Sequence, residues 1–136
     1  MYRLYHYFLC SSSRFVRIVL EEKKLKFHLL IENYWHPNND FLMMNPAGYF
    51  PVLVTKENVP VVGSSVIMEY LEELNLSPLL LNNEYKSEIR RLVHWFDNTF
   101  KKDVLNPILY EKVFKRFEKN LNPNSSIIRK SFENYK

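Results

Sequence analysis

Cys10 is the residue whose type and position could do covalent chemistry. It lies in the stretch LCSSSRFVRIVL, between an apolar segment and a segment with helical periodicity. The first turn of a helix carries unpaired N–H groups and the positive end of the helix dipole, and both stabilise a thiolate. The position therefore predicts a reactive sulfur. The alternative is that Cys10 is a small buried hydrophobic residue, the commoner state of a lone cysteine.

Ser13 follows Cys10 by three residues, which is the spacing of a C-x-x-C redox pair with serine in place of the second cysteine. Such a site can form a mixed disulfide but has no second sulfur with which to resolve it. The alternative for Ser13 is a hydroxyl that only lies within the first helical turn.

The segments around these residues predict an α/β domain. A strand over 2–7, a helix over 12–24 and a strand over 27–31 form a strand–helix–strand unit with parallel pairing. The segment 32–40 is expected to be a loop, and a helix of at most two turns should end before Pro46. An antiparallel hairpin with its tip at 56–58 and a helix from Val66 complete the order βαβαββα.

The second half of the chain predicts helices. Residues 76–83 carry no charge and include Pro78, so we expect a domain over 1–77, a linker over 78–85 and a partial all-helical domain over 86–136. Asn106–Pro107 should interrupt the first helical run. A turn and helix cap over 122–126 should precede a last helix that continues to Lys136.

Composition limits the possible functions. The chain has 136 residues, 46% of them hydrophobic, which suffices for a packed core. One cysteine excludes an internal disulfide, and no apolar run is long enough to span a membrane, so a cytoplasmic location is expected. The charge of +4 comes from residues 111–136, with seven Lys/Arg against three Glu, so nucleic-acid binding is not expected. No metal is expected, because His36 has no partner at ligand spacing.

Three blocks of the chain resemble the cytosolic glutathione transferase superfamily in its bacterial form. They are LYHYFLCSSSRFVRIVLEEKKL with its C-x-x-S-R-x-V-R core, DFLMMNPAGYFPVLV with N-P-x-G-x-x-P-x-L, and VVGSSVIMEYLEE with S-x-x-I-x-x-Y-L. The helical stretch RRLVHWFDNTFKKDV is similar to the fourth helix of the same group. Both glycines, Gly48 and Gly63, fall inside these blocks.

The resemblance implies a thioredoxin-like N-terminal domain followed by an incomplete all-α domain. It implies a cis bond between Phe50 and Pro51, with the backbone of Phe50 pairing with the cysteinyl part of glutathione. It assigns the γ-glutamyl carboxylate to Ser65 at a helix N-terminus, a place that binds anions. Many members carry an acidic residue where this chain has Ser64, the other candidate glutathione contact.

The function implied by the resemblance is glutathione-dependent transfer with Cys10 and Ser13 as catalytic residues. Glutathione would be the co-substrate for conjugation to a small electrophile, or for thiol transfer and deglutathionylation of a mixed disulfide through Cys10. A homodimer is expected, as is usual in the family.

Two alternatives remain open. The family's helical domain continues for several helices past the position of Lys136, so the chain resembles a truncated member with a weak or missing second-substrate site. It could therefore be a non-catalytic interaction module whose shortened helical part docks a partner. The other alternative is a glutaredoxin-like reductase in which the sheet domain acts alone.

Overall fold

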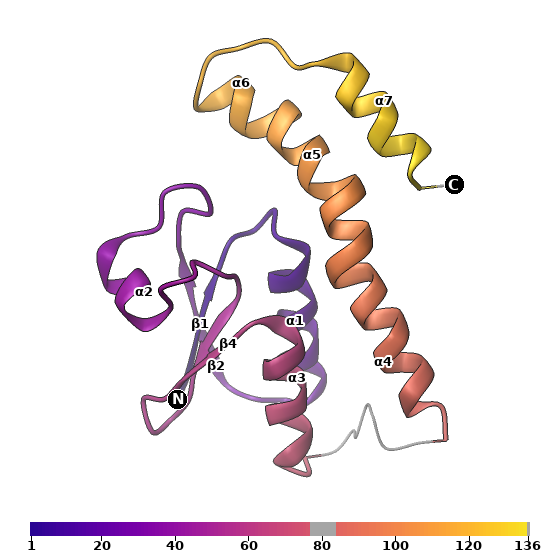
Figure 1. Cartoon of the computed structure of the whole chain (residues 1–136). Helices are drawn as coiled ribbons and strands as arrows, with labels where there is room; N and C mark the ends of the chain where they lie inside the picture. The colour runs from indigo at the N-terminus through magenta and orange to yellow at the C-terminus, as the bar shows by residue number, and fades with distance from the viewer. Residues whose placement is uncertain (77–83, 136) are drawn as a thin grey trace. The chain divides into compact units, whose positions relative to one another are not determined.

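The computed structural model describes residues 1–76 and 84–135 (Figure 1). The chain divides into two compact units, Met1–Ile89 and Arg90–Lys136. The first is a thioredoxin-like α/β domain and the second is helical, which confirms the predicted fold class. The linker expected at 78–85 lies largely outside the described residues, so the domain limits 1–77 and 86–136 stay predictions. Among the described helices, none is long and apolar enough to cross a membrane.

The sheet of the first unit has four strands in the order β2-β1-β3-β4. The strands are β1 (Tyr2–His6), β2 (Phe27–Ile31), β3 (Val52–Val54) and β4 (Pro60–Val62). β1 pairs with β2 in parallel and with β3 antiparallel, and β3 and β4 form the expected hairpin. The predicted order βαβαββα is therefore confirmed.

Three helices cover the two faces of this sheet. They are α1 (Ser11–Glu22), α2 (Asn39–Met44) and α3 (Ser64–Glu73). Figure 1 shows α1 and α3 on one face and α2 on the other. Leu4, Leu20, Leu53 and Leu71 belong to the core between the sheet and α1 and α3. Val52 and Val54 point the other way and pack with Phe41 of α2, as strand alternation requires.

Helix boundaries in the first unit differ from those expected by one or two residues. α1 ends at Glu22 instead of residue 24, because Lys24 adopts the left-handed conformation (φ 53°) that closes the helix. α3 begins at Ser64 instead of Val66, and Gly63 precedes it with φ 89°. Apolar periodicity identifies the buried side of a helix, so it did not detect this polar first turn.

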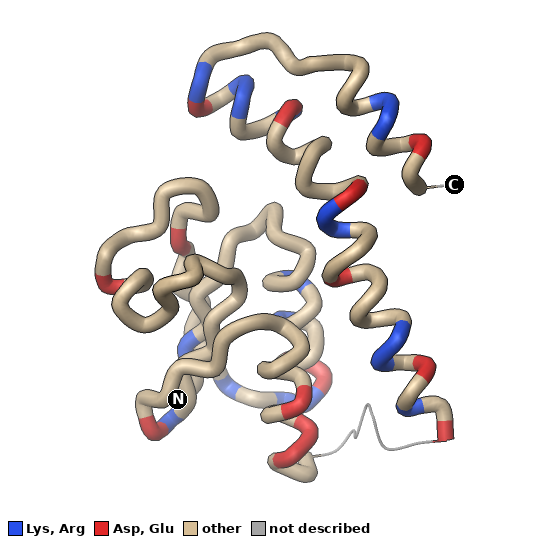
Figure 2. The backbone as a smooth tube through the Cα atoms, in the orientation of Figure 1, with Lys and Arg blue, Asp and Glu red and all other residues tan. Residues whose placement is uncertain are grey.

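The helical segments after residue 84 follow one another along the chain. They are α4 (Lys86–His94), the π-helical η1 (Trp95–Leu105), α5 (Asn106–Leu109), the π-helical η2 (Tyr110–Phe114), α6 (Lys115–Phe117) and α7 (Ser125–Glu133). Figure 2 shows charges of both signs along the run from α4 to α6, while the acidic residues of α3 gather in its C-terminal half.

The interruption expected at Asn106–Pro107 is wrong, because η1 continues directly into α5. Pro107 has no N–H to donate to the preceding turn. In that turn the Asp103 carbonyl accepts a hydrogen bond from Asn134 Nδ2 at 3.3 Å. A side chain that follows α7 therefore supplies a donor beside the proline.

The expected turn before the last helix is confirmed. Asn124 caps α7 by accepting from the Ser126 N–H at 3.0 Å. Glu111 is buried and accepts from the Asn124 N–H at 2.6 Å and from Lys115 Nζ at 3.0 Å. These two donors lower the pKa of the Glu111 carboxyl. α7 ends at Glu133, before the expected end at Lys136.

Candidate functional site

Cys10 lies at the junction of β1 and α1, as the sequence predicted. Its N–H donates to the Tyr7 carbonyl at 3.0 Å, and its carbonyl accepts from the Arg14 N–H at 3.1 Å. It has the extended backbone of an N-cap residue (φ −77°, ψ 117°). The residue is therefore held on both sides by the turn that joins strand to helix.

The side chain of Cys10 is buried. The residue is 3% exposed, makes no side-chain capping bond to α1, and packs in a cluster with Phe41, Phe50 and Val52. Its surroundings thus match the small buried hydrophobic residue that was the alternative at this position. A catalytic role for Cys10 stays a prediction, and it requires a movement that admits a substrate sulfur.

Ser13 is fully buried in the first turn of α1. Its Oγ accepts from the Tyr7 N–H at 3.5 Å, across the turn in which Cys10 lies. This is the arrangement of a hydroxyl that supports the turn. A catalytic role for Ser13 also stays a prediction.

Tyr34 is an aromatic neighbour of Cys10 that the sequence analysis missed. Its ring centroid lies 5.5 Å from that of Phe50 and 5.9 Å from that of Tyr7. This half-buried side chain packs against the cluster that contains Cys10. Burial, and next the charge of Cys10, raise the pKa of the Tyr34 hydroxyl. The aromatic pair in Asn33-Tyr34-Trp35, within an otherwise polar loop, is the signal that could have identified it.

Glu32 holds the loop that carries Tyr34. Its buried carboxylate accepts from the Asn33 N–H at 3.0 Å, from the Asn38 N–H at 3.1 Å and from the Asn38 side chain. Asn38 in turn caps α2 by accepting from the Phe41 N–H at 2.8 Å. One carboxylate therefore joins both ends of the loop that carries Tyr34.

The segment before β3 has the geometry that the resemblance implied. The Phe50–Pro51 bond is cis, and Gly48 adopts a left-handed conformation with φ 66°. The Phe50 side chain is 5% exposed and belongs to the same cluster as Cys10. The Pro51 carbonyl accepts from the Gly63 N–H at 2.9 Å, which joins this segment to the start of α3.

Ser64 and Ser65 occupy the first turn of α3, but they face different surroundings. Ser64 is 3% exposed and points into the protein, whereas Ser65 is exposed. An anion that approaches this helix N-terminus from solvent would meet the hydroxyl of Ser65 and the N–H groups of the first turn. Ser65 is thus better placed than Ser64 for direct contact with a ligand.

The structure brings the sequence-predicted residues into one region of the first unit. Cys10 and Phe50 share a cluster, and Pro51 is bonded to Gly63, the residue before Ser64. Within residues 1–76 and 84–135, no three His, Cys, Asp or Glu side chains gather as a metal site would require. The region combines a buried thiol, an exposed hydroxyl at the start of α3 and an apolar cluster.

Comparisons with known proteins identify a family model and relatives that are similar to this chain. The family model described as glutathione S-transferase, N-terminal domain, matches residues 9–74. FtsZ-localized protein A of Caulobacter vibrioides is 35% identical over 135 residues, covering 96% of this chain and 59% of that protein.

Solved structures agree over nearly the whole chain. The crystal structure of a glutathione S-transferase from Rhodospirillum rubrum is 41% identical with a TM-score of 0.89, covering 99% of this chain and 61% of that one. The structure of FzlA from C. crescentus is 36% identical with a TM-score of 0.90, covering 98% and 61%. The chain thus spans about three fifths of the length of these relatives.

Proposed function

The chain belongs to the glutathione transferase superfamily, and on that premise we propose that it binds glutathione and acts in glutathione-dependent transfer. The proposed site consists of the backbone at Phe50–Pro51, the first turn of α3 at Ser64 and Ser65, and the N-terminus of α1 at Cys10. The second substrate is a small electrophile or a mixed disulfide. The active form is proposed to be a homodimer.

The observation that carries this proposal is the hydrogen bond between Gly63 and Pro51. Its length of 2.9 Å fixes the first turn of α3 beside the segment that precedes β3. A tripeptide laid along Phe50 could therefore reach the N–H groups at the start of α3 with its γ-glutamyl carboxylate. Ser65, which is exposed, would add a hydroxyl to this anion site.

The reaction would use the N-terminus of α1. A glutathione sulfur held there meets the positive end of the helix dipole and the N–H groups of the first turn, which favour the thiolate. In conjugation this thiolate attacks the electrophile. In thiol transfer the Cys10 thiolate would attack a mixed disulfide and release one thiol, and glutathione would then reduce the new Cys10 disulfide and leave as oxidised glutathione. Because Cys10 is 3% exposed, this reaction requires a local movement that opens the cluster around the sulfur.

Titration of the full chain with glutathione tests the proposed site. Calorimetry should show saturable binding that Ser65→Ala weakens by roughly tenfold, the effect of losing one hydrogen bond to a charged group. Ser87→Ala is the matched control, because Ser87 is also an exposed serine at the second position of a helix, α4. Absence of binding, or equal losses in the two variants, would contradict the proposed site.

A second candidate function is a non-catalytic docking module of the same fold. Two observations favour it: Cys10 and Ser13 are both buried, and one relative carries the name FtsZ-localized protein A. On this proposal the chain would bind a protein partner, and glutathione would bind without turnover. Conjugation and disulfide-exchange assays that detect no turnover, together with intact glutathione binding, would favour this function over transfer.

A further inference from the structure

β2 lies at the edge of the sheet, and β1 is its one strand neighbour among the described residues. The Glu32 N–H donates to the His6 carbonyl at 3.0 Å. Every second residue before it, Leu30 and His28, therefore also directs its backbone N–H and C=O groups toward β1. Because this direction alternates along a strand, the N–H and C=O groups of Phe27, Leu29 and Ile31 point away from the sheet. They form a row of donors and acceptors with which another strand can pair.

The strand β2 itself lacks three common protections against such pairing. Native edge strands are commonly blocked by proline, lysine, a bulge or a covering element. The strand sequence FHLLI contains neither proline nor lysine, and its pairing with β1 runs without a bulge from Tyr2–Phe27 to His6–Ile31. Leu29 is 41% exposed and Ile31 is 73% exposed. Apolar side chains are thus presented to solvent on an open strand.

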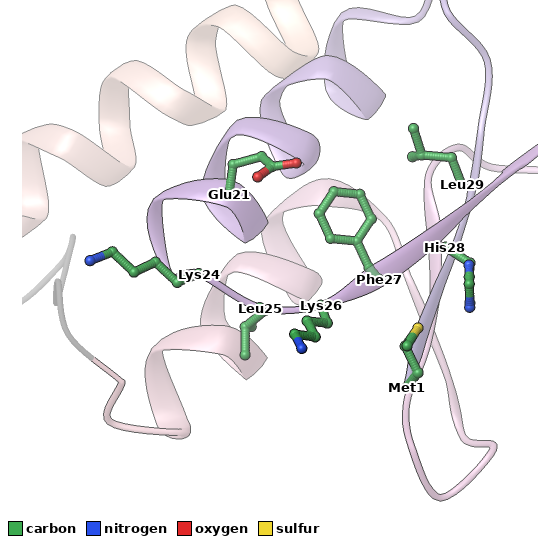
Figure 3. A pocket seen from close by; sticks show the side chains of 8 residues that line it. All are labelled: Met1, Glu21, Lys24, Leu25, Lys26, Phe27, His28 and Leu29. Atoms are coloured by element: carbon green, nitrogen blue, oxygen red, sulfur yellow. The ribbon is translucent and has the colours of Figure 1, made fainter.

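A cavity of about 680 Å³ lies beside the first half of β2 (Figure 3). It is lined by the end of α1, the turn after it, the start of β2 and the N-terminal residue. The lining residues are Met1, Glu21, Lys24, Leu25, Lys26, Phe27, His28 and Leu29. We call the cavity together with the free edge of β2 the β2 edge site.

The two sides of the strand differ in chemistry. Figure 3 shows the Phe27 ring and the Leu29 side chain on the side of β2 that faces α1, and the His28 imidazole on the other side. Strand alternation places Lys26 on the same side as His28, so over residues 26–29 one side is apolar and the other carries the basic side chains. Glu21 is the one acidic residue of the lining, against two lysines.

We propose that the β2 edge site docks an extended segment of a partner protein in which acidic and apolar side chains alternate. The segment adds to the sheet as a strand next to β2, with its backbone bonded to Leu29 and Ile31. Its apolar side chains contact Phe27 and Leu29, and its acidic side chains lie on the side of Lys26 and His28. Charge complementarity and strand alternation thus both favour a partner segment in which acidic and apolar residues alternate. The proposal does not depend on glutathione binding.

The probe for this site is a synthetic six-residue peptide that alternates glutamate and valine. With the full chain, we expect saturable binding that weakens as salt is added, and slower hydrogen exchange at the Leu29 and Ile31 amides. The matched peptide that alternates lysine and valine should bind at least roughly tenfold more weakly. No slowing at these two amides, or equal affinity for the two peptides, would overturn the proposal.

Two variants test the mechanism of docking. Leu29→Pro removes an outward N–H that β1 does not use, so it should leave the thermal unfolding temperature nearly unchanged and weaken peptide binding by roughly tenfold. Leu29→Thr keeps the N–H and loses only part of the apolar contact, so it should weaken binding less than Leu29→Pro. Lys26→Glu should weaken binding, whereas Lys102→Glu, the same change at an exposed lysine of η1, should not.

Wild-type affinity in Leu29→Pro would overturn the strand-addition model. If the Leu29 and Ile31 amides instead become protected as the concentration of the chain alone rises, the occupant is a second copy, and the proposed partner segment is wrong. If Leu29→Pro unfolds, the test is the comparison of peptide affinity between Lys26→Glu and Lys102→Glu. Equal affinity in these two variants overturns the proposal.

Discussion

Lys23 Nζ lies 2.7 Å from Glu72 Oε1, and the two side chains are 0% and 10% exposed. Lys23 Nζ also donates to the Leu76 carbonyl at 3.0 Å. This buried cation therefore connects the end of α1 to the C-terminal half of α3 and to the chain that follows it. A lysine at the end of a helix also interacts favourably with the negative pole of the helix dipole.

Lys23→Ala should destabilise the first unit strongly. The substitution removes the ammonium group from a Glu72 carboxylate that is 10% exposed, and breaking a buried ion pair typically costs about 3–5 kcal/mol of unfolding free energy. Urea denaturation measures the change. Lys26→Ala, at an exposed lysine three residues later, is the control and should change stability by less than about 0.5 kcal/mol. Similar losses in the two variants would show that the buried pair contributes little.

His6 should make the stability of the first unit depend on pH. The residue is 3% exposed, and neither ring nitrogen forms a hydrogen bond within the described part of the chain. Burial, and then the charge of Arg17, lower the pKa of His6. The unfolded chain therefore binds a proton more readily, so the contribution of neutral His6 is complete above about pH 6.5 and is lost as pH falls below it.

Denaturation of wild type and His6→Leu at several pH values checks this dependence. Below about pH 6.5, the stability of wild type should fall more steeply than that of His6→Leu, by at most about 1.4 kcal/mol per pH unit. Above that pH the two curves should run parallel. Parallel curves over the whole range would show that His6 is protonated equally in the folded and unfolded states.

Glu32→Gln should expose Cys10. The carboxylate closes the loop that carries Tyr34, and loss of a charged acceptor from three donors should favour opening by about 1–3 kcal/mol. The rate at which Ellman's reagent labels Cys10 should then rise by about 5- to 100-fold. Glu57→Gln, at an exposed turn residue, is the matched control and should leave the rate unchanged. Equal rates in wild type and Glu32→Gln would show that this loop does not limit access.

Cys10→Ser should separate the two reactions proposed for the site. Reduction of a glutathionylated peptide should be lost, because a hydroxyl does not exchange with a disulfide. Conjugation of glutathione to 1-chloro-2,4-dinitrobenzene should persist, because that reaction uses the sulfur of glutathione. Product formation by absorbance and mass spectrometry measures both. Persistence of disulfide reduction in Cys10→Ser would exclude Cys10 as its nucleophile.

The sequence by itself determined the order of elements in the first unit and the location of the candidate site. The alternation of apolar and polar residues in strands and the periodicity of apolar residues in helices are local properties of the sequence. They therefore predicted the strand–helix–strand unit and the β3–β4 hairpin. Cys10 and Ser13 were candidates because they lie at the start of a predicted helix, and the resemblance to the family added Phe50, Pro51, Ser64 and Ser65. These positions needed no knowledge of long-range contacts.

Only the tertiary structure decided which of these side chains face solvent. Ser64 and Ser65 are adjacent in sequence, yet packing buries the first and exposes the second. Tyr34, from a loop more than twenty residues away, packs against the cluster that contains Cys10, and Lys23 meets Glu72 across nearly fifty residues. Burial and pairing depend on which distant segments meet, and a local pattern carries no information about that.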